Sequence, residues 1–378
     1  MAQPTSQSAE QPATRRPGVL VHLKKFWRRV TEGLELSQLW KQFQADASAS
    51  YRLYSRDFQA RAPHQTWRHN FFRTLQELAW AILEKLSPAR RLLLLLGVVL
   101  LIFPAGSFSY HDFYGGVLLF ILLMLEVADR VVMKRDLEIA RDIQRWLLPA
   151  TPPQVPGLAI AFATRPANTV AGDYYDVFAR PAPAPAQPRF LLAVADVAGK
   201  SIPAALLMAT FQASLRTLSA TSASLGEVIA GMNQYACTNS QSGVRFTTAL
   251  LAEFDPANRA LTYINAGHNA PILRRSSGGV ERLTAGGLPL GIRANGSYES
   301  GSVSLQAGDW LVIFTDGLVE AVNERDEEYG ERRLLDVLQA GASATPDELL
   351  RRMMSEADAF VGDTPQHDDI TCMVVRVA

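Results

Sequence analysis

Aspartates at the ends of apolar, strand-like runs constrain the fold of this chain more than any other feature. They are Asp173 in AGDYYDVF, Asp196 in LLAVADVAGKS, Asp316 in VIFTDGLVEA and Asp368 in HDDITCMVV. We therefore expect each carboxylate at a strand end, beside the next one. Clustered carboxylates with few histidines suit Mg²⁺ or Mn²⁺, which prefer oxygen ligands. Two such ions close together make a hydroxide from water and hold a phosphoryl group for in-line attack, so the pattern predicts phosphate hydrolysis.

Taken singly, each aspartate also has an ordinary structural explanation. Asp-Gly after a strand, as at Asp316, is typical of a turn, and Asp173 with Asp176 in GDYYD is compatible with turn capping. Asp368 and Asp369 are compatible with a solvated loop. Burying several carboxylates together is costly without a cation, however, because like charges repel. Their ordered recurrence from Asp173 to Asp368 therefore favours one shared site.

The composition limits the class of protein. With 378 residues the chain is expected to hold more than one domain. Lys and Arg together number 37, as do Asp and Glu, and this balance argues against a general nucleic-acid binder. Cys237 and Cys372 are the only cysteines, which excludes a disulfide framework and fits a reducing compartment. Residues 1–17 are polar and rich in Pro, Gln and Ser, so we expect them to be disordered, with no secretory signal after them.

Two apolar segments precede the aspartates. Leu92–His111 carries no formal charge over 20 residues, and Phe113–Leu125 is uncharged again. One helix from Leu92 to Leu125 would measure about 51 Å, longer than the roughly 30 Å hydrocarbon core of a bilayer. Residues 91–128 are therefore predicted to form a transmembrane helical hairpin, and basic residues at both outer ends indicate that both ends face the cytoplasm. The alternative is a buried helical pair in a soluble domain.

The segments on either side of this hairpin are predicted to be helical. Residues 18–90 alternate basic with aromatic or aliphatic positions, which favours amphipathic helices on anionic membrane lipids or, equally, a small helical domain. Residues 129–150 are predicted to form a linker helix, because Glu126–Leu148 lacks Gly and Pro. A coiled-coil-like seam interrupted by Gln144 predicts a homodimer joined through this helix; its members are Met133, Leu137, Ala140 and Leu147. The alternative is a rigid spacer.

Residues 151–378 are predicted to form the catalytic domain. Hairpin turns such as DPANR and capping-box helix starts at Ser224 and Thr345 indicate an α+β sandwich rather than a doubly wound parallel sheet. The expected strands are Leu158–Thr164, Phe190–Ala195, Thr247–Phe254, Ala260–Asn265, Trp310–Thr315 and Ile370–Val377. The expected helices are Ile202–Ala220, Leu225–Ser240, Glu331–Ala340 and Pro346–Val361.

The ordered motifs resemble a known family over Ile139–Val377. They run from AGDYYDVF and ADVAGKSIPAALLMA through YINAGHNAPILRR and GLPLGI to FTDGLVEAVNERDEEYG and HDDITCMVV. This order resembles the metal-dependent protein phosphatases of the type 2C superfamily, in the bacterial branch of stage II sporulation protein E and the sigma-factor regulatory phosphatases. The resemblance implies a β-sandwich flanked by helices, with two Mn²⁺ or Mg²⁺ ions in a cleft at its edge.

The resemblance also implies a role for each motif residue. Asp196 would bridge both metals, and the carbonyl of Val197 would add a backbone ligand. Asp173 would serve one metal directly or through water, while Asp316 and Asp368 would hold the other. A metal-bridging hydroxide would then attack a phosphoserine or phosphothreonine without a covalent enzyme intermediate.

The chain departs from the family pattern at three places. Ala171 replaces the first glycine of Gly-Gly-Asp, a small change, and Ser201 replaces the last glycine of Gly-Lys-Gly, which matters if that position requires a positive φ. No arginine stands at the usual phosphate-gripping position, so Lys200 and Arg165 are candidate substitutes, although each also fits a structural or solvated role. His268 in NAGHNAP is expected to hold a loop, with general acid as the alternative, and His367 is not expected to bind metal.

Together these features predict a membrane-anchored, metal-dependent serine/threonine protein phosphatase. The resemblance implies a phosphorylated anti-sigma factor antagonist as its substrate, in a partner-switching pathway. We expect the protein at the inner membrane, with its catalytic domain in the cytoplasm. The alternative is an inactive phosphatase-fold scaffold that binds signalling partners. The presence of every metal-site aspartate argues against that alternative.

Overall fold

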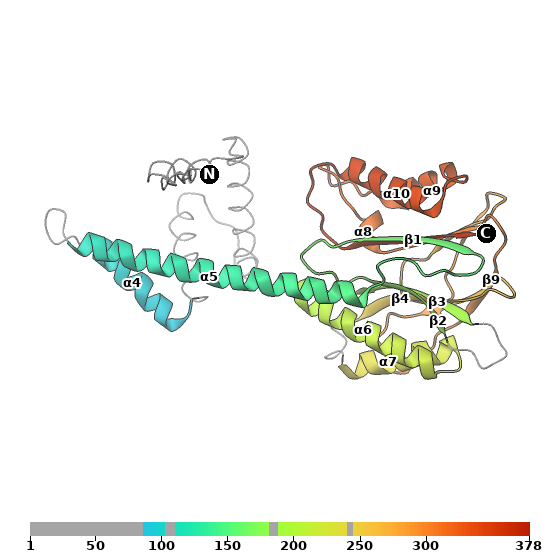
Figure 1. The fold of residues 1–378 in the computed structure, drawn as a ribbon, viewed down its shortest axis with the longest axis horizontal. Helices are drawn as coiled ribbons and strands as arrows, with labels where there is room; N and C mark the ends of the chain where they lie inside the picture. The colour runs from blue at the N-terminus through green and yellow to red at the C-terminus, as the bar shows by residue number, and fades with distance from the viewer. Residues whose placement is uncertain (1–85, 103–109, 181–187, 240–244) are drawn as a thin grey trace, which may run out of the picture. The chain divides into compact units, whose positions relative to one another are not determined.

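The computed structural model of the protein describes residues 86–102, 110–180, 188–239 and 245–378 (Figure 1). The chain divides into two compact units, Met1–Glu126 and Val127–Ala378. The second unit contains the predicted catalytic domain and is named the catalytic unit. The predictions for residues 1–17 and for most of residues 18–90 fall outside the described residues. Residues 103–109, between the two apolar helices of the predicted hairpin, fall outside them too.

The apolar segments form two helices, α4 (Pro88–Ile102) and α5 (Tyr110–Leu147). The second apolar segment and the linker helix, predicted as separate elements, are one continuous helix. No Gly or Pro interrupts the chain from Val117 to the end of α5, so nothing breaks the helix between them. Within the described ranges, no helix is both long and apolar enough to cross a membrane. The predicted transmembrane hairpin is therefore not supported.

The face of α5 that carries the predicted seam is not a free face near its end. Gln144 is buried, Leu147 is half-buried, and Leu148 packs against the core of the catalytic unit. The seam residue Met133, farther from the end of α5, is exposed, as are Val131, Val132, Ile139, Ile143 and Trp146. Gln144, which interrupts the predicted seam, thus packs the end of the helix against the catalytic unit of the same chain. Dimerisation through this helix stays a prediction.

The catalytic unit contains two β-sheets that pack face to face. The first has the order β1-β11-β10-β6-β7, with antiparallel neighbours throughout. Its strands are β1 (Leu158–Arg165), β6 (Ile272–Arg274), β7 (Val280–Arg282), β10 (Trp310–Phe314) and β11 (Ile370–Val377). The second has the order β2-β3-β4-β5-β8, and β9 also pairs with β5. Its strands are β2 (Tyr174–Arg180), β3 (Arg189–Val197), β4 (Thr247–Asp255), β5 (Ala260–Ala266), β8 (Gly286–Gly287) and β9 (Gly301–Ser304).

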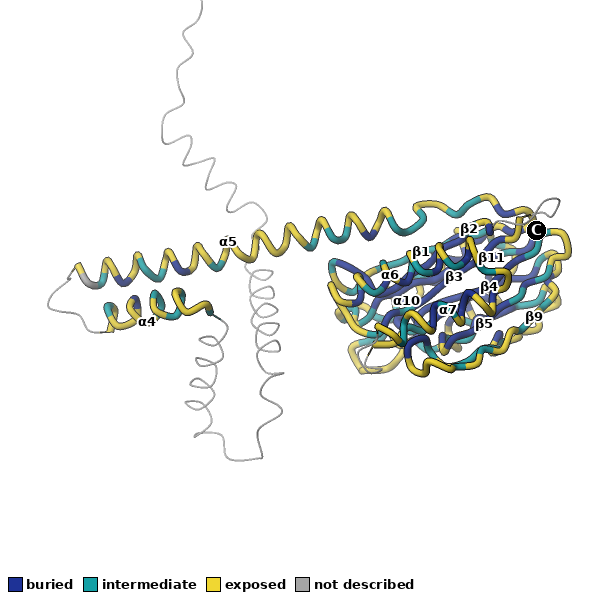
Figure 2. The backbone as a smooth tube through the Cα atoms, turned by 90° about the horizontal axis from the view of Figure 1, so that it is seen from below, coloured by how far each residue is buried: buried dark blue, intermediate teal, exposed yellow. Residues whose placement is uncertain are grey.

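Helices cover both outer faces of this sandwich (Figure 1). Packed on the second sheet are α6 (Ser201–Thr221) and α7 (Leu225–Asn239), and packed on the first are α9 (Gly330–Ala340) and α10 (Pro346–Val361). A single turn, α8 (Asp316–Val319), follows β10. The buried residues accordingly concentrate on the strands (Figure 2).

Alternation along the central strands divides their side chains between two cores. On β10, Leu311 and Ile313 point between the sheets, while Trp310, Val312 and Phe314 pack under α9 and α10. Strands covered on both faces read as continuous apolar runs rather than as alternating ones. This explains why the runs before Asp196 and Asp316 are uniformly apolar.

The predicted α+β sandwich is confirmed, with every named strand and helix of the catalytic domain present within a residue or two of its expected bounds. The capping box at Thr345 is complete, with Glu348 as its partner. At Ser224 only half of the box forms: Glu227 donates its N–H to the serine hydroxyl at 3.2 Å, but its carboxylate accepts from Ala223. The strand β2, the short strands β6 to β9, and α8 were not predicted from the sequence.

Candidate active site

Two of the predicted site aspartates come together because β2 and β3 are antiparallel neighbours. Asp173 directly precedes β2, and Asp196 is the penultimate residue of β3. The register places Tyr174 opposite Ala195, so the start of one strand lies beside the end of the other. Both carboxylates therefore belong to the same end of the second sheet.

The other two aspartates come together in the same way in the first sheet. Asp316 follows β10 by two positions, and Asp368 precedes β11 by two positions. These strands are antiparallel, with Phe314 opposite Cys372. Asp316 and Asp368 therefore share one end of the first sheet.

A threonine joins the two sheet ends. Thr315 accepts a hydrogen bond from the backbone N–H of Thr371 at 2.9 Å and donates its hydroxyl to the Asp173 carboxylate at 3.0 Å. Thr315 follows β10 of the first sheet, whereas Asp173 leads into β2 of the second. One fully buried hydroxyl thus ties the carboxylates of one sheet to those of the other.

Asp369 holds the loop that leads to Asp173. Its carboxylate accepts hydrogen bonds from the backbone N–H groups of Ala167, at 2.7 Å, and Gly172, at 2.6 Å. Asp369, which follows the predicted ligand Asp368, therefore orients the backbone that leads to the predicted ligand Asp173. Charge-assisted bonds of this kind are about twice as strong as neutral ones, so this loop is firmly placed.

Burial, together with neighbouring carboxylates, raises the pKa of Asp173, Asp196 and Asp316. The pKa of Asp173 is raised first by burial and then by the charge of Asp196. The pKa of Asp196 is raised to about 7 by burial and then by Asp316 and Asp368. Burial, followed by Asp368, also raises the pKa of Asp316. The charge of Asp196 acts on Asp173, and the charges of Asp316 and Asp368 act on Asp196. The four carboxyl groups therefore form one electrostatic cluster that a cation would stabilise.

The donor chemistry fits a divalent metal ion. In the ranges that the structure describes, no group of three His, Cys, Asp or Glu side chains is arranged closely enough to hold an ion as it stands. The groups that converge are nevertheless carboxylate oxygens, the donors that Mg²⁺ and Mn²⁺ prefer. The carbonyl of Val197 lies near Gly172, between the two strand ends. The ligand roles of Asp173, Asp196, Val197, Asp316 and Asp368 stay predictions that this arrangement suits.

Two glycines allow the backbones to approach each other at the site. A Cβ on Gly317 would lie 2.1 Å from the carbonyl oxygen of Asp369, and a Cβ on Gly172 would lie 3.0 Å from that of Val197. Glycine is therefore required at position 317 because Asp316 packs closely against the segment of Asp368, and not because the backbone there has a positive φ. This packing is what the turn interpretation of Asp-Gly had missed.

The segment that follows Asp196 contains a strained residue. Ser201, the first residue of α6, has φ +64°, in the left-handed region that favours glycine. A non-glycine residue there costs roughly 1–2 kcal/mol. The position of the missing last glycine of Gly-Lys-Gly therefore does have a positive φ, as the sequence departure had suggested.

The two candidate phosphate-binding cations are both engaged with carboxylates. The ammonium group of Lys200 lies 3.1 Å from Asp368 and donates to the carbonyl of His367. The guanidinium group of Arg165 pairs with Asp358 on α10. Lys200 is thus beside the carboxylate cluster, whereas Arg165 has a structural partner outside it.

His268 is buried beside the same end of the second sheet. Its Nδ1 atom lies 2.9 Å from the hydroxyl of Thr248, the residue opposite Asp196, and Asn265 bonds its backbone. Burial lowers the pKa of His268 from its ordinary value of 6.5 to about 4. The imidazole is therefore neutral near pH 7, which favours the loop-holding interpretation over the general acid. His367 has an exposed side chain.

Gln144 connects the end of α5 to the carboxylate site. Its side-chain amide donates to the carbonyl of Ala171 at 2.7 Å and accepts from the N–H of the same residue at 3.0 Å. Ala171 is followed by Gly172 and Asp173. In the sequence, Gln144 was interpreted only as a break in an apolar seam. An amide at an otherwise apolar position was the signal that could have revealed this contact.

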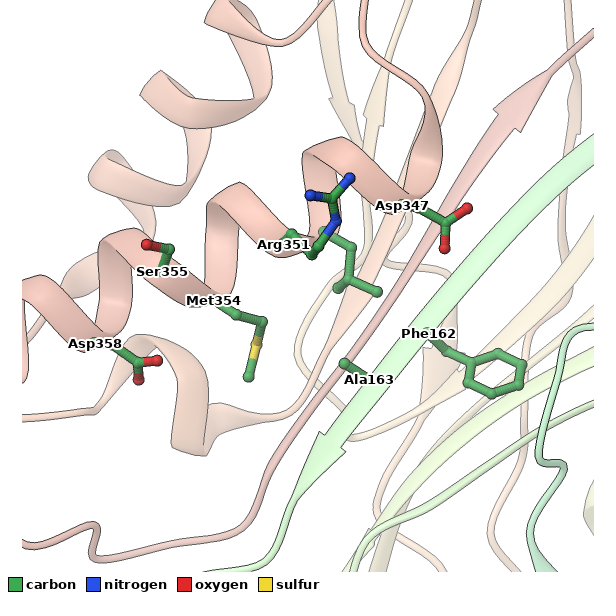
Figure 3. A pocket seen from close by; sticks show the side chains of 8 residues that line it. Phe162, Ala163, Asp347, Arg351, Met354, Ser355 and Asp358 are labelled. Atoms are coloured by element: carbon green, nitrogen blue, oxygen red, sulfur yellow. The ribbon is translucent and has the colours of Figure 1, made fainter.

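A groove of about 400 Å³ lies elsewhere, between β1 and α10 (Figure 3). Its lining includes Phe162 and Ala163 from the strand and Asp347, Arg351, Met354, Ser355 and Asp358 from the helix. None of the four clustered aspartates lines it. Asp358, the ion-pair partner of Arg165, is one of its lining residues.

Solved structures share this fold. The SiaA-PP2C domain of Pseudomonas aeruginosa matches with a TM-score of 0.57 and 24% identity, over 66% of this chain and 99% of that one. The PP2C phosphatase domain of SpoIIE from Bacillus subtilis matches with a TM-score of 0.50 and 19% identity, over 58% of this chain and 61% of that one. The chain therefore has the fold of these PP2C domains, a helix-covered sandwich of two sheets.

Sequence comparison gives the family. The profile of stage II sporulation protein E (SpoIIE) matches residues 186–378, just over half of the chain. The chain belongs to this family of PP2C-type serine/threonine phosphatases, which confirms the resemblance. Phosphoserine phosphatase RsbU of Bacillus subtilis is 29% identical over 246 residues, or 65% of this chain and 70% of that protein. Protein IcfG of Synechocystis is 28% identical over 286 residues, and the match spans 67% of this chain but only 43% of that protein.

We expect Gly317→Ala to weaken metal binding. The new methyl group would meet the Asp369 carbonyl, so Asp316 must move away from Asp368. Isothermal titration calorimetry with Mn²⁺ should show at least a 10-fold loss of affinity, comparable to the loss when a residue that orients a ligand is removed. Gly279→Ala is the control, because a Cβ there meets nothing within 4 Å. Equal affinities for the two variants would contradict the packing role of Gly317.

We expect His268 to make folding sensitive to mild acid. Its pKa is lower in the folded protein than in the unfolded chain, so its stabilisation is complete above pH 6.5 and is lost as the pH falls toward 4. The loss reaches about 3 kcal/mol at 1.36 kcal/mol per unit. Denaturant unfolding between pH 7 and 4 should show a flatter pH slope for His268→Gln than for the wild type. His367→Gln, at an exposed histidine, should keep the wild-type slope; a wild-type slope in both variants would refute this prediction.

Proposed function

We propose that this protein is a metal-dependent serine/threonine protein phosphatase whose substrate is a phosphorylated anti-sigma factor antagonist. The observation that carries the proposal is the cluster of Asp173, Asp196, Asp316 and Asp368 at the joined sheet ends, where each raised pKa has burial and a neighbouring carboxylate among its causes. Family membership supports the reaction class. The name phosphoserine phosphatase, carried by RsbU and RsbP of Bacillus subtilis, supports serine as the phosphorylated residue.

The proposed site divides its work between the two sheets. Asp173 and Asp196 would hold metal from the second sheet, and Asp316 and Asp368 from the first, with the Val197 carbonyl as a further oxygen donor. Two bound Mg²⁺ or Mn²⁺ ions would supply a hydroxide nucleophile and neutralise charge on the phosphoryl group. The protein's own contribution is to fix the spacing, through Thr315 between the sheets and Asp369 under the loop.

Lys200 is the cation available to the substrate in this proposal. Its ammonium group already lies beside Asp368 and is half exposed. A metal ion held by Asp368 would repel this ammonium group and free it to meet a phosphate oxygen. His268 does not act as general acid in this scheme, because its neutral imidazole is buried against Thr248.

The competing function is a scaffold with a phosphatase fold and no turnover. The presence of all four aspartates, together with the buried hydroxyl and backbone donors that position them, supports the enzyme over the scaffold. A scaffold has no need for a repulsive carboxylate cluster, since such a cluster lowers stability unless a cation is bound.

We further propose that the protein acts at the inner membrane, with its catalytic unit in the cytoplasm. The support is the apolar surface of α4 and of the first turns of α5. The most exposed of these side chains are Leu92, Ile102, Tyr110, Phe113 and Phe120. We expect the full-length protein to float with vesicles containing anionic lipid, whereas a chain that begins at Val127 remains in the soluble fraction. Flotation of neither protein, or of both, would contradict attachment through these helices.

Asp196→Asn tests the catalytic proposal. The change removes the charge of the proposed bridging ligand with almost no change in volume. Phosphate release from a phosphoserine peptide with Mn²⁺ should fall by more than about 100-fold, since losing even a group that orients a ligand costs 10- to 100-fold. Asp363→Asn, at an exposed aspartate outside the cluster, should keep wild-type turnover. Full activity of Asp196→Asn would overturn the ligand assignment, and an inactive wild type would favour the scaffold.

A further inference from the structure

The exposed apolar side chains of the catalytic unit are unevenly distributed. Beyond α5, the large apolar residues exposed among the described residues are Tyr235, Val280 and five others. These five, named here the apolar rim, are Ile202, Leu206, Phe246, Leu288 and Ile292. Their exposed fractions range from 37% at Phe246 to 64% at Leu206, so each presents a substantial surface to solvent.

The first part of the apolar rim begins beside the carboxylate cluster. Ile202 is two residues after Lys200, whose ammonium group lies 3.1 Å from Asp368. Leu206 is one turn further along α6, on the same side of that helix. The first turns of α6 therefore present apolar side chains next to a group of the active site.

The rest of the apolar rim is attached to the segment that follows Asp196. Ala198 donates its backbone N–H to the carbonyl of Phe246 at 3.0 Å. The residue after Phe246, Thr247, exchanges two backbone hydrogen bonds with Leu290, at 2.8 and 3.0 Å. Leu290 stands midway between Leu288 and Ile292. All five rim residues thus gather around the end of the second sheet that carries Asp173 and Asp196.

Basic side chains are interleaved with the apolar rim. Arg245 precedes Phe246 and Arg293 follows Ile292, and both are exposed. Neither forms an ion pair with another residue in the described part of the chain, unlike Lys200. The surface beside the site is therefore apolar and positively charged. That combination is complementary to an apolar surface with acidic or phosphorylated neighbours.

We propose that the apolar rim, with Arg245 and Arg293, is the docking surface for the folded phosphoprotein substrate. This inference rests on the proposed phosphatase function and adds what selects the substrate. A phosphoserine must approach the carboxylate cluster, so a folded protein that presents it has to cover the adjoining rim. The rim then buries apolar area that a short phosphopeptide or a small phosphate ester does not reach. Selection among phosphoproteins therefore lies in contacts outside the reacting atoms.

The experiment compares substrates of different size on charge variants of the rim. Leu206→Glu and Ile292→Glu place charges in the apolar surface, and Arg293→Glu reverses the sign beside it. Val280→Glu, at an exposed apolar residue of β7, and Arg332→Glu, at an exposed arginine of α9, are matched controls. The substrates are p-nitrophenyl phosphate, a short phosphoserine peptide, and the folded serine-phosphorylated anti-sigma factor antagonist encoded in the same genome.

We expect the rim variants to lower kcat/KM for the folded phosphoprotein at least 10-fold, through KM. They should change kcat/KM for p-nitrophenyl phosphate and for the peptide less than 2-fold. The two control variants should match the wild type on all three substrates. This pattern, with unchanged Mn²⁺ affinity, supports docking on the rim.

The contrary outcomes are distinct. Equal losses on all three substrates would mean that the rim maintains the active site, which overturns the docking proposal. Unchanged kinetics on the folded substrate would overturn it as well, as would a rim variant that changed only the oligomeric state or vesicle binding. A wild type that hydrolysed none of the substrates would instead refute the proposed phosphatase function.

Discussion

The hydrogen bond from Thr315 to Asp173 is the contact on which the site depends most. It fixes an end of one sheet to an end of the other, and it lies in the protein interior. On each side of it, antiparallel pairing brings two aspartates to the same strand ends. The sandwich therefore does more than bury apolar side chains. It forces together carboxylates that would separate if either sheet could slide.

That arrangement has a cost that the packing must offset. Burial and mutual repulsion raise the pKa of Asp173 and Asp196, so the metal-free cluster is held together against its own electrostatics. The strain at Ser201 adds to this, directly after the strand that bears Asp196. The continuous apolar runs of β3 and β10, buried on both faces, supply stability that offsets this cost. Instability concentrated at a functional site, within an otherwise well-packed fold, is a common pattern in enzymes.

The sequence predicted the elements whose signals are local. Long apolar runs identified β3, β4 and β11, and the capping box at Thr345 correctly marked the start of α10. The order of the aspartates predicted which strand ends should meet. The strand β2 was missed because Tyr174-Tyr175-Asp176 interrupts its apolar pattern, although Asp176 is fully buried and paired with Arg216.

Contacts between distant segments were beyond local signals. The reason for glycine at 317 is a carbonyl 52 positions later in the chain, and the partner of Gln144 is a backbone 27 residues away. Neither follows from periodicity. The hairpin was predicted from charge and length, and the linker helix from its lack of Gly and Pro. The two were treated as separate elements, whereas α5 runs unbroken from one into the other.

The two hydrogen bonds between Gln144 and Ala171 place α5 and the carboxylate cluster in one thermodynamic cycle. The helix has 38 residues, or about 57 Å at 1.5 Å per residue, and Gln144 lies in its last turn. Any coupling between the two through Ala171 is reciprocal. Part of the free energy of cation binding would depend on the position of Ala171. The same amount of free energy would then stabilise the end of α5 in its place. A force or ligand that displaces α5 from Ala171 would have to supply that same amount.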